Sequence, residues 1–145
     1  MRVNTTHCLL LKTSTLFAIE TDVRWLEILQ AHFSCEIRLQ SVATAKAENS
    51  PPMHHVYLHF EEPQPFSADD VMSAEKIWHG LSGHKADVSR LQLAMRRPGA
   101  THHASTCVHY VVETDPEEGW HDEIFRWYDQ EHMPGLAEVP GTLLA

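Results

Sequence analysis

The amino-acid sequence predicts an α+β fold built around an antiparallel sheet. Segments in which apolar and polar residues alternate, as they do in half-buried strands, are separated by stretches whose apolar residues recur at helical spacing. These segments follow the order βαββαβ between residues 7 and 96, and a β-α-β arrangement begins again after Pro98 and Gly99. We therefore expect two parts, a unit of residues 1–99 and a partial second repeat of that unit in residues 100–145.

The first three elements of residues 1–99 are a strand, a helix and a strand. A short apolar run at residues 7–12 predicts a buried strand. Apolar residues then recur at helical spacing as far as Phe33, which predicts a helix over about residues 20–33. Residues 35–40 place apolar side chains on one side and polar side chains on the other, so a half-buried strand follows.

The fourth and fifth elements are a strand and a helix. Residues 55–60 alternate in the same way after a loop that holds two prolines. Ser67 can cap a helix over about residues 67–82, because Asp70 stands at the position from which a side chain reaches back to the cap. Either Gly80 or Gly83 lies near the end of this helix, where glycine commonly terminates helices.

Leu91, Leu93 and Met95 alternate with polar residues and predict the last strand of the unit. The resulting βαββαβ order is that of a split βαβ, or ferredoxin-like, unit. In such a unit the third strand lies between the first and the second. We expect both helices on a single face of one antiparallel sheet.

If the apolar residues of these strands face the helices, the opposite face of the sheet carries imidazole, phenol and guanidinium groups. Its members would be Arg38, Gln40, His55, Tyr57, His59, Gln92 and Arg96. An antiparallel sheet commonly leaves one face to solvent or to an interface. Alternatively, this face orients an acidic or phenolic ligand, with Arg38, His55, Tyr57 and His59 as the candidate ligand-binding residues.

The C-terminal part is expected to hold a strand, a helix and a further strand. Residues 107–112 form the expected strand, apolar on both faces. A helix over residues 116–133 is favoured by Asp115 as its cap and by the proline that follows, and we expect it to stop at Pro134. A strand would begin at Thr142. Because this half repeat lacks a neighbour for its first strand, we expect a homodimer that supplies one, or a longer natural chain.

His132 stands at the end of that predicted helix, with Trp127 and Tyr128 about one turn earlier. One interpretation is a buried apolar face and an imidazolium favoured by the helix dipole. The other places His132 at a cleft as a general acid–base, with Tyr128 holding an oxyanion and Trp127 binding the ligand. Asp129 either holds and polarises the imidazole or is solvated on the outer face.

Residues 127–134, followed by the turn at residues 139–141, resemble the helix-to-strand segment of the EthD-like group within the dimeric α+β barrel superfamily. In that group a histidine-x-proline precedes a proline-glycine turn. The resemblance implies a ferredoxin-like unit that pairs sheet to sheet in a dimer, with a pocket between sheet and helices. It also implies that the histidine matched by His132 is the residue most often suspected of acting. Known members include small-molecule isomerases and cyclases.

The composition excludes several classes of function. The net charge is −9 with histidine neutral and no basic cluster occurs, so nucleic acid and anionic membranes are not expected partners. The histidines lack the spacing of known metal motifs and no glycine-rich phosphate loop is present, so we expect neither metal nor cofactor. Unpaired cysteines without CxxC spacing, and an N-terminal apolar run too short for a secretory signal, favour the cytoplasm.

Two functions of different classes follow from the sequence. The first is a cofactor-free isomerase, lyase or cyclase that acts on a small carbonyl or aromatic metabolite by histidine acid–base chemistry. The second is a non-catalytic small-molecule-binding or assembly protein that uses the same fold. The fold alone does not decide between them, because one scaffold hosts unrelated activities.

Overall fold

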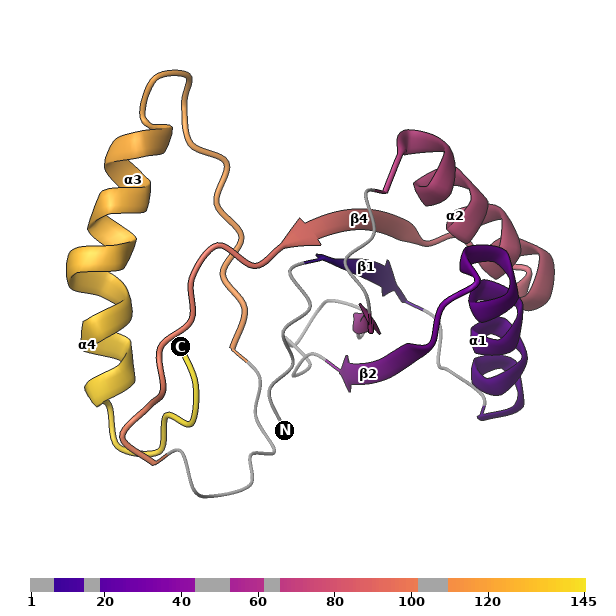
Figure 1. The fold of residues 1–145 in the computed structure, drawn as a ribbon, viewed down its shortest axis with the longest axis horizontal. Coiled ribbons are helices and arrows are strands. Elements are labelled where there is room, and N and C mark those ends of the chain that lie inside the picture. Colours follow the sequence, from indigo (N-terminus) through magenta and orange to yellow (C-terminus); the bar gives the residue numbers. More distant parts are fainter. Residues whose placement is uncertain (1–6, 15–18, 44–52, 62–65, 102–109) are drawn as a thin grey trace. The chain divides into compact units, whose positions relative to one another are not determined.

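The computed structural model describes residues 7–14, 19–43, 53–61, 66–101 and 110–145 (Figure 1). The chain divides into two compact units, Met1–Leu93 and Ala94–Ala145. The boundary falls a few residues before the one expected after Gly99, because the last strand of the first unit ends at Gln92. Each unit is described by itself below.

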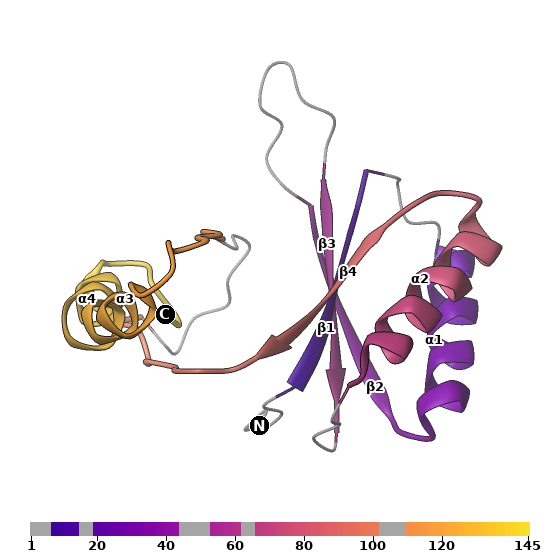
Figure 2. The same ribbon diagram turned by 90° about the horizontal axis from the view of Figure 1, so that it is seen from above.

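The first unit holds a four-stranded antiparallel sheet and two helices. Its elements are β1 (His7–Thr13), α1 (Ile19–Phe33), β2 (Ile37–Ala43), β3 (His54–Phe60), α2 (Ala68–Ser82) and β4 (Asp87–Gln92). The strand order is β2-β3-β1-β4, and every neighbouring pair is antiparallel. Figure 2 shows α1 and α2 on the same side of the sheet. The expected antiparallel sheet, with β3 between β1 and β2, is confirmed.

The core of the first unit lies between the sheet and these helices. Trp25 of α1 and Trp78 of α2 are fully buried, and their rings meet edge to face with centroids 5.2 Å apart. Leu9 and Leu11 of β1 are also fully buried and belong to the same cluster. Burial of large apolar side chains is the main favourable term in folding, so the two tryptophans fix the position of the helix pair on the sheet.

Local signals set the ends of α2. Ser67 accepts a hydrogen bond from the Asp70 backbone N–H at 3.2 Å, and the Asp70 carboxylate accepts bonds from the Ser67 backbone N–H at 2.6 Å and from its hydroxyl at 2.8 Å. This confirms the predicted capping box. At the other end Gly83 takes the left-handed conformation, with φ of 71°, and its N–H bonds to the His79 carbonyl. The terminating glycine is therefore Gly83, and Gly80 lies within the helix.

The predicted orientation of β4 is wrong. In the pairing of β1 with β4, Val88 lies opposite Leu11 and Arg90 lies opposite Leu9, so Val88 and Arg90 are on the helix side. Leu91 lies opposite Cys8 and therefore faces away from the helices. Gln92, expected on that outer face, instead shares the side of Val88 and Arg90.

The orientation of β4 was mispredicted because only one of its residues is buried. Val88 is the one buried residue of β4, so the strand shows no long apolar alternation on its inner face. The alternation at Leu91, Leu93 and Met95 runs past the end of the strand, because the latter two residues follow Gln92. Arg96 likewise lies beyond the sheet.

The second unit is built on one helical stretch with three parts. These are α3 (His121–Trp127), the π-helical turn η1 (Tyr128–His132) and α4 (Met133–Glu138). The expected start at Pro116 is wrong, because Gly119 takes a positive φ of 90° in a turn just before the helix.

The expected stop at Pro134 is also wrong. The N–H of Met133 bonds to the Tyr128 carbonyl, five residues back, which is the bond of a π turn. Pro134 then falls in the first turn of α4, where its missing N–H costs no helical hydrogen bond.

The structure also differs from the strands that were expected on either side of this helix. Tyr110, Val111 and Val112 are not in a strand, and residues 107–109 of that expected strand lie outside the described residues. The C-terminus instead pairs with the segment after β4, through backbone bonds between Arg97 and Ala145 and an isolated antiparallel bridge of Pro98 with Leu144.

Gly99 is required by this pairing, because a Cβ there would overlap the carbonyl of Thr142. The close approach of two backbones is a common reason for glycine in extended segments. Residues 97–99 and 143–145 therefore form a short two-stranded contact, which joins the segment after β4 to the C-terminal residues.

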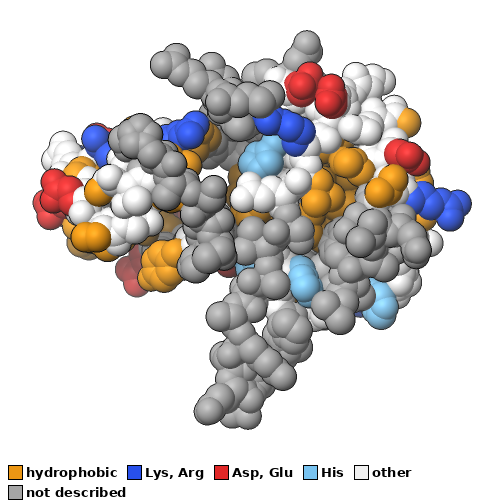
Figure 3. All heavy atoms as spheres, turned by 90° about the horizontal axis from the view of Figure 1, so that it is seen from below, with side chains coloured by type: hydrophobic (Ala, Val, Ile, Leu, Met, Phe, Trp, Pro, Cys, Tyr) orange, Lys and Arg blue, Asp and Glu red, His pale blue; other side chains and the backbone are white. Residues whose placement is uncertain are grey.

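Hydrophobic side chains of the second unit remain at its surface. No residue of α3, η1 or α4 is buried. Figure 3 shows orange hydrophobic and red acidic side chains together on this part of the chain, which lies on the left in that view as in Figure 1. Trp120, Phe125 and Trp127 are between 40% and 52% exposed.

Candidate functional site

The π turn gathers three aromatic rings at the centre of the helical stretch. The rings of Trp127 and His132 stack with centroids 4.5 Å apart and planes 24° apart. Tyr128 meets His132 edge to face at 5.1 Å and 89°. Residues five apart in an α-helix point about 140° away from each other at 100° per residue, so they do not stack. The wider π turn brings them onto one side and creates this cluster.

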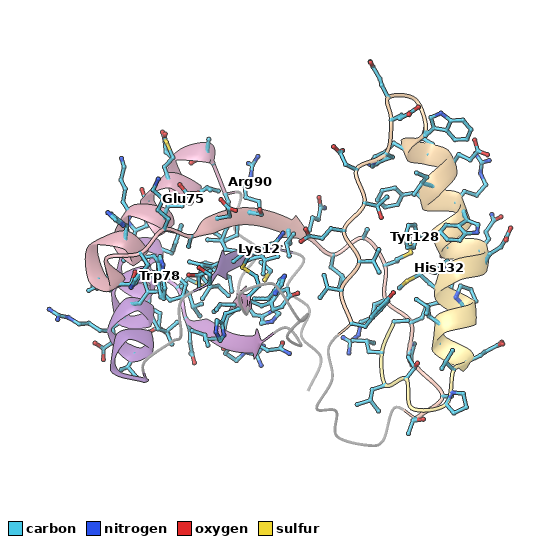
Figure 4. All side chains as sticks on the ribbon, turned by 180° about the vertical axis from the view of Figure 1, so that it is seen from behind. Lys12, Glu75, Trp78, Arg90, Tyr128 and His132 are labelled. Atoms are coloured by element: carbon cyan, nitrogen blue, oxygen red, sulfur yellow. The ribbon has the colours of Figure 1, made fainter. Side chains whose placement is uncertain are left out.

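His132 borders an open pocket, which we call the His132 pocket. It has a volume of about 340 Å³ and is lined by Trp127, Glu131, His132, Gly135, Leu136 and Val139. The imidazole is half-buried, and Figure 4 shows Tyr128 and His132 on the same helix, about one turn apart. The sequence-based expectation that His132 lies at a cleft agrees with this position.

The chemistry of the His132 pocket combines an aromatic wall with two polar groups. Trp127 is 44% exposed and offers aromatic surface to a ligand. The imidazole of His132 and the carboxylate of Glu131 lie at the same pocket. An imidazole beside a bound ligand can accept or donate a proton, which is the requirement for general acid–base chemistry.

Asp129 does not have the expected partner. Its carboxylate forms an ion pair with Arg97, with Nη2 and Oδ1 2.8 Å apart, and the same guanidinium donates to the Asp129 backbone carbonyl at 2.9 Å. Both side chains are about half exposed. An exposed pair of this kind contributes little to stability, but it ties the segment after β4 to the helix. Asp129 is therefore a structural residue here rather than the group that orients His132.

The outer face of the sheet in the first unit carries the other expected site residues. In the pairing of β2 with β3, Arg38 lies opposite His59 and Gln40 lies opposite Tyr57. His59 Nε2 and Gln40 Oε1 are 3.3 Å apart, and the rings of Tyr57 and His59 are stacked with centroids 6.2 Å apart. His55 lies two residues before Tyr57 on the same face and is buried. The expectation that these side chains share a face is confirmed.

The protonation of His59 is shifted by its surroundings. Burial lowers the pKa of the His59 imidazole from its ordinary value, and the positive charge of Arg38 lowers it further. Both causes disfavour the imidazolium, because burial removes hydration from the charge and the guanidinium repels it. His59 is thus a neutral hydrogen-bonding group beside a permanent cation, which suits recognition of an anionic or phenolic oxygen.

Several residues near these sites were not predicted as site residues from the sequence. Gly135, Leu136 and Val139 line the His132 pocket, but the helix was expected to end before them. Cys8 lies opposite His59 on the outer face of the sheet. Burial raises the pKa of its thiol to about 12, although a backbone hydrogen bond to Leu58 opposes the shift. Alternation along β1 was the one signal that placed Cys8 on that face.

The two groups of expected site residues belong to different units of the chain. Arg38, His55, Tyr57 and His59 are in the first unit, and Trp127, Tyr128 and His132 are in the second. Within the described residues, no group of three or more histidine, cysteine, aspartate or glutamate side chains is placed to hold a metal ion. In the same part of the chain, no helix has both the length and the apolar character needed to cross a membrane.

Comparison with protein-family models, with curated protein sequences and with solved structures finds no match to this chain. The resemblance of residues 127–134 and 139–141 to the EthD-like group therefore rests on that motif alone.

Proposed function

We propose that this protein binds a small carbonyl or aromatic metabolite in the His132 pocket and that His132 exchanges a proton with it. The observation that carries the proposal is the half-buried imidazole stacked on Trp127 at the edge of an open pocket. The proposed reaction class is a cofactor-free isomerisation, elimination or cyclisation. π turns occur frequently at functional sites, which supports the choice of this region.

The proposed steps use Trp127 and His132, which line the His132 pocket, and Tyr128, which contacts His132 from outside that lining. A planar ligand packs against the exposed part of Trp127 on the side where His132 lies, so that its carbonyl or phenolic oxygen is near the imidazole. His132 removes a proton from carbon or oxygen and returns it at another position. Tyr128, expected from the sequence to hold the oxyanion, does not line the His132 pocket, and its proposed role is to hold the imidazole in place through the edge-to-face contact of the two rings.

We further propose that the first unit is ferredoxin-like and that two cytoplasmic chains pair through their sheets. The element order βαββαβ, the strand order β2-β3-β1-β4 and the placement of both helices on one face support this assignment. In a sheet-to-sheet homodimer the outer face would line an enclosed interior. Arg38, Tyr57 and His59 would then meet an acidic or phenolic ligand away from bulk water.

Enolisation of phenylpyruvate, an aromatic keto acid, tests the His132 proposal. Exchange of its methylene protons with deuterated water is followed by proton NMR. We expect the protein to accelerate exchange and His132→Gln to lose about 10²–10⁴-fold of that acceleration, the usual contribution of a general base. His121→Gln is the matched control, because His121 is on α3 and does not line the His132 pocket.

A second variant separates loss of the imidazole from loss of the pocket. Gly135→Leu adds a side chain to the wall of the His132 pocket, and no atom lies within 4 Å of the Cβ position. We expect it to abolish exchange while the thermal midpoint stays the same or rises, since glycine is unfavourable within a helix. If phenylpyruvate binds at the pocket but no variant changes its exchange rate, the catalytic proposal is wrong and the pocket has the non-catalytic binding function.

A further inference from the structure

A second pocket lies on another side of the same helical stretch, and we call it the Tyr128 pocket. The helix contributes His121, Ile124, Phe125, Tyr128 and Met133 to it, and the segments before the helix contribute residues 94–95 and residues within 112–116. All of these residues belong to the second unit. The Tyr128 pocket has a volume of about 310 Å³ and shares no lining residue with the His132 pocket.

The lining of the Tyr128 pocket is mainly apolar and carries no formal charge with histidine neutral. Met95, Val112 and Ile124 supply aliphatic and thioether surface, and no lysine, arginine, aspartate or glutamate lines it. Moving a charged group from water into such a site costs free energy that no opposite charge would offset. An occupant of this pocket is therefore uncharged.

The residues at this pocket favour an aromatic occupant. Phe125 is 40% exposed and its ring lies 4.6 Å from that of His121, so an aromatic surface is available at the pocket wall. Met133 contributes a thioether, and sulfur makes favourable contacts with aromatic ring edges. Ligand pockets are typically apolar, with a few polar groups that fix orientation. The hydroxyls of Tyr128 and Thr114 can fill that role for one hydroxyl or carbonyl group.

The volume limits the size of the occupant. An apolar cavity of roughly 150 Å³ holds one benzene molecule. A pocket of about 310 Å³ therefore accommodates a compound of one or two rings, whereas a long acyl chain or a nucleotide exceeds it.

We propose that the Tyr128 pocket is a binding site for a compact, uncharged aromatic compound with a hydroxyl or carbonyl group, of the phenol class. This site is separate from the His132 pocket and does not depend on catalysis there. Tyr128 connects the two, because its side chain lines this pocket and its ring also meets His132 edge to face. Occupancy of the Tyr128 pocket is therefore expected to alter the NMR signals of the His132 imidazole.

Fluorine NMR with 4-fluorophenol and 4-fluorobenzoate tests the proposal on the full chain. The two probes share a ring and a fluorine but differ in charge. We expect 4-fluorophenol to bind, and 4-fluorobenzoate to bind at least tenfold more weakly, because no lysine or arginine lines the pocket to pair with the carboxylate. Equal affinity for the two probes, or binding of neither, would overturn the proposal.

Two filling variants locate the site. Ala94→Leu adds a side chain at an exposed position of the Tyr128 pocket and should weaken 4-fluorophenol binding at least tenfold. Gly135→Leu, the same enlargement at the His132 pocket, should leave that binding unchanged. If Ala94→Leu lowers the thermal midpoint, Thr114→Leu, at another exposed lining position, replaces it. Unchanged affinity in the well-folded filling variant, or loss of affinity in Gly135→Leu instead, would show that the phenol does not bind here.

Discussion

Two glycines of α2 should respond in opposite directions to the same substitution. Gly80 lies within the helix and has no positive φ, whereas Gly83 follows the helix with φ of 71°. At either position a Cβ would meet no atom within 4 Å. A methyl group therefore changes packing at neither site, and the difference between Gly80→Ala and Gly83→Ala reports backbone conformation alone.

The expected magnitudes follow from the two conformations. Alanine is favoured over glycine within a helix by about 0.5–1 kcal/mol, so Gly80→Ala should stabilise the protein by that amount. At Gly83 the left-handed conformation costs alanine about 1–2 kcal/mol. Alanine also restricts the unfolded chain more than glycine does, which favours the folded state by about 0.4–1 kcal/mol. Gly83→Ala should therefore destabilise the protein by about 0.8 kcal/mol, within a range of about 0–1.6 kcal/mol.

Urea unfolding followed by circular dichroism measures both free energies, and thermal unfolding gives a second reading. For a chain of this length 1 kcal/mol corresponds to roughly 4 °C in the midpoint. Changes of the same sign in Gly80→Ala and Gly83→Ala would refute the assignment of Gly83 as the left-handed cap.

Three further outcomes are expected in the first unit. With its pKa raised to about 12 from 9.0, Cys8 should react with iodoacetamide at pH 8 roughly a thousandfold more slowly in the folded protein than in urea, as mass spectrometry of its peptide will show. Ser67→Ala should cost about 1 kcal/mol through loss of the helix cap. Hydrogen bonds from the Ser67 backbone N–H and hydroxyl lower the pKa of the Asp70 carboxyl, so the stability that the ionised Asp70 contributes should be complete above the ordinary value of 3.8 and fall away at lower pH, which urea unfolding at several pH values measures. The folded state lowers the pKa of His59 below 6.5, so stability should decline as pH falls below that value, and His59→Gln should reduce the decline between pH 7.5 and 5.5.

The sequence was sufficient to predict most of the first unit, because its signals are local and strong. Apolar spacing located α1 and α2, and the capping box at Ser67 set the start of α2 almost to the residue. Alternation in β3 placed Tyr57 and His59 together on the outer face. It failed in β4, where the inner face holds one buried residue and the apolar alternation continues beyond the strand.

The second unit was harder to predict, because its features depend on contacts between distant segments. The C-terminal residues pair with residues 97–99, and nothing in the local pattern indicates that partner. Asp129 was expected to assist His132, but Arg97 lies far away in the sequence and forms the ion pair. The sequence placed Trp127 about one turn before His132, and the structure brings both side chains to the lining of the His132 pocket.

A π turn also changes which side chains lie on the same side of a helix. With a uniform period of 3.6 residues, Trp127 and His132 fall on different sides of the helix, and so do Tyr128 and Met133. Each of these pairs lines one pocket in the structure, Trp127 with His132 and Tyr128 with Met133. Both pairs are five residues apart, which is the spacing that a π turn brings to one side of a helix. The hydrogen bond of this π turn runs from the Met133 N–H to the Tyr128 carbonyl. Pro134 follows this turn directly and, because it lacks an N–H, cannot donate the backbone bond that an α-helix makes at this position. The proline that was expected to end the helix instead lies beside the turn that brings Trp127 and His132 together.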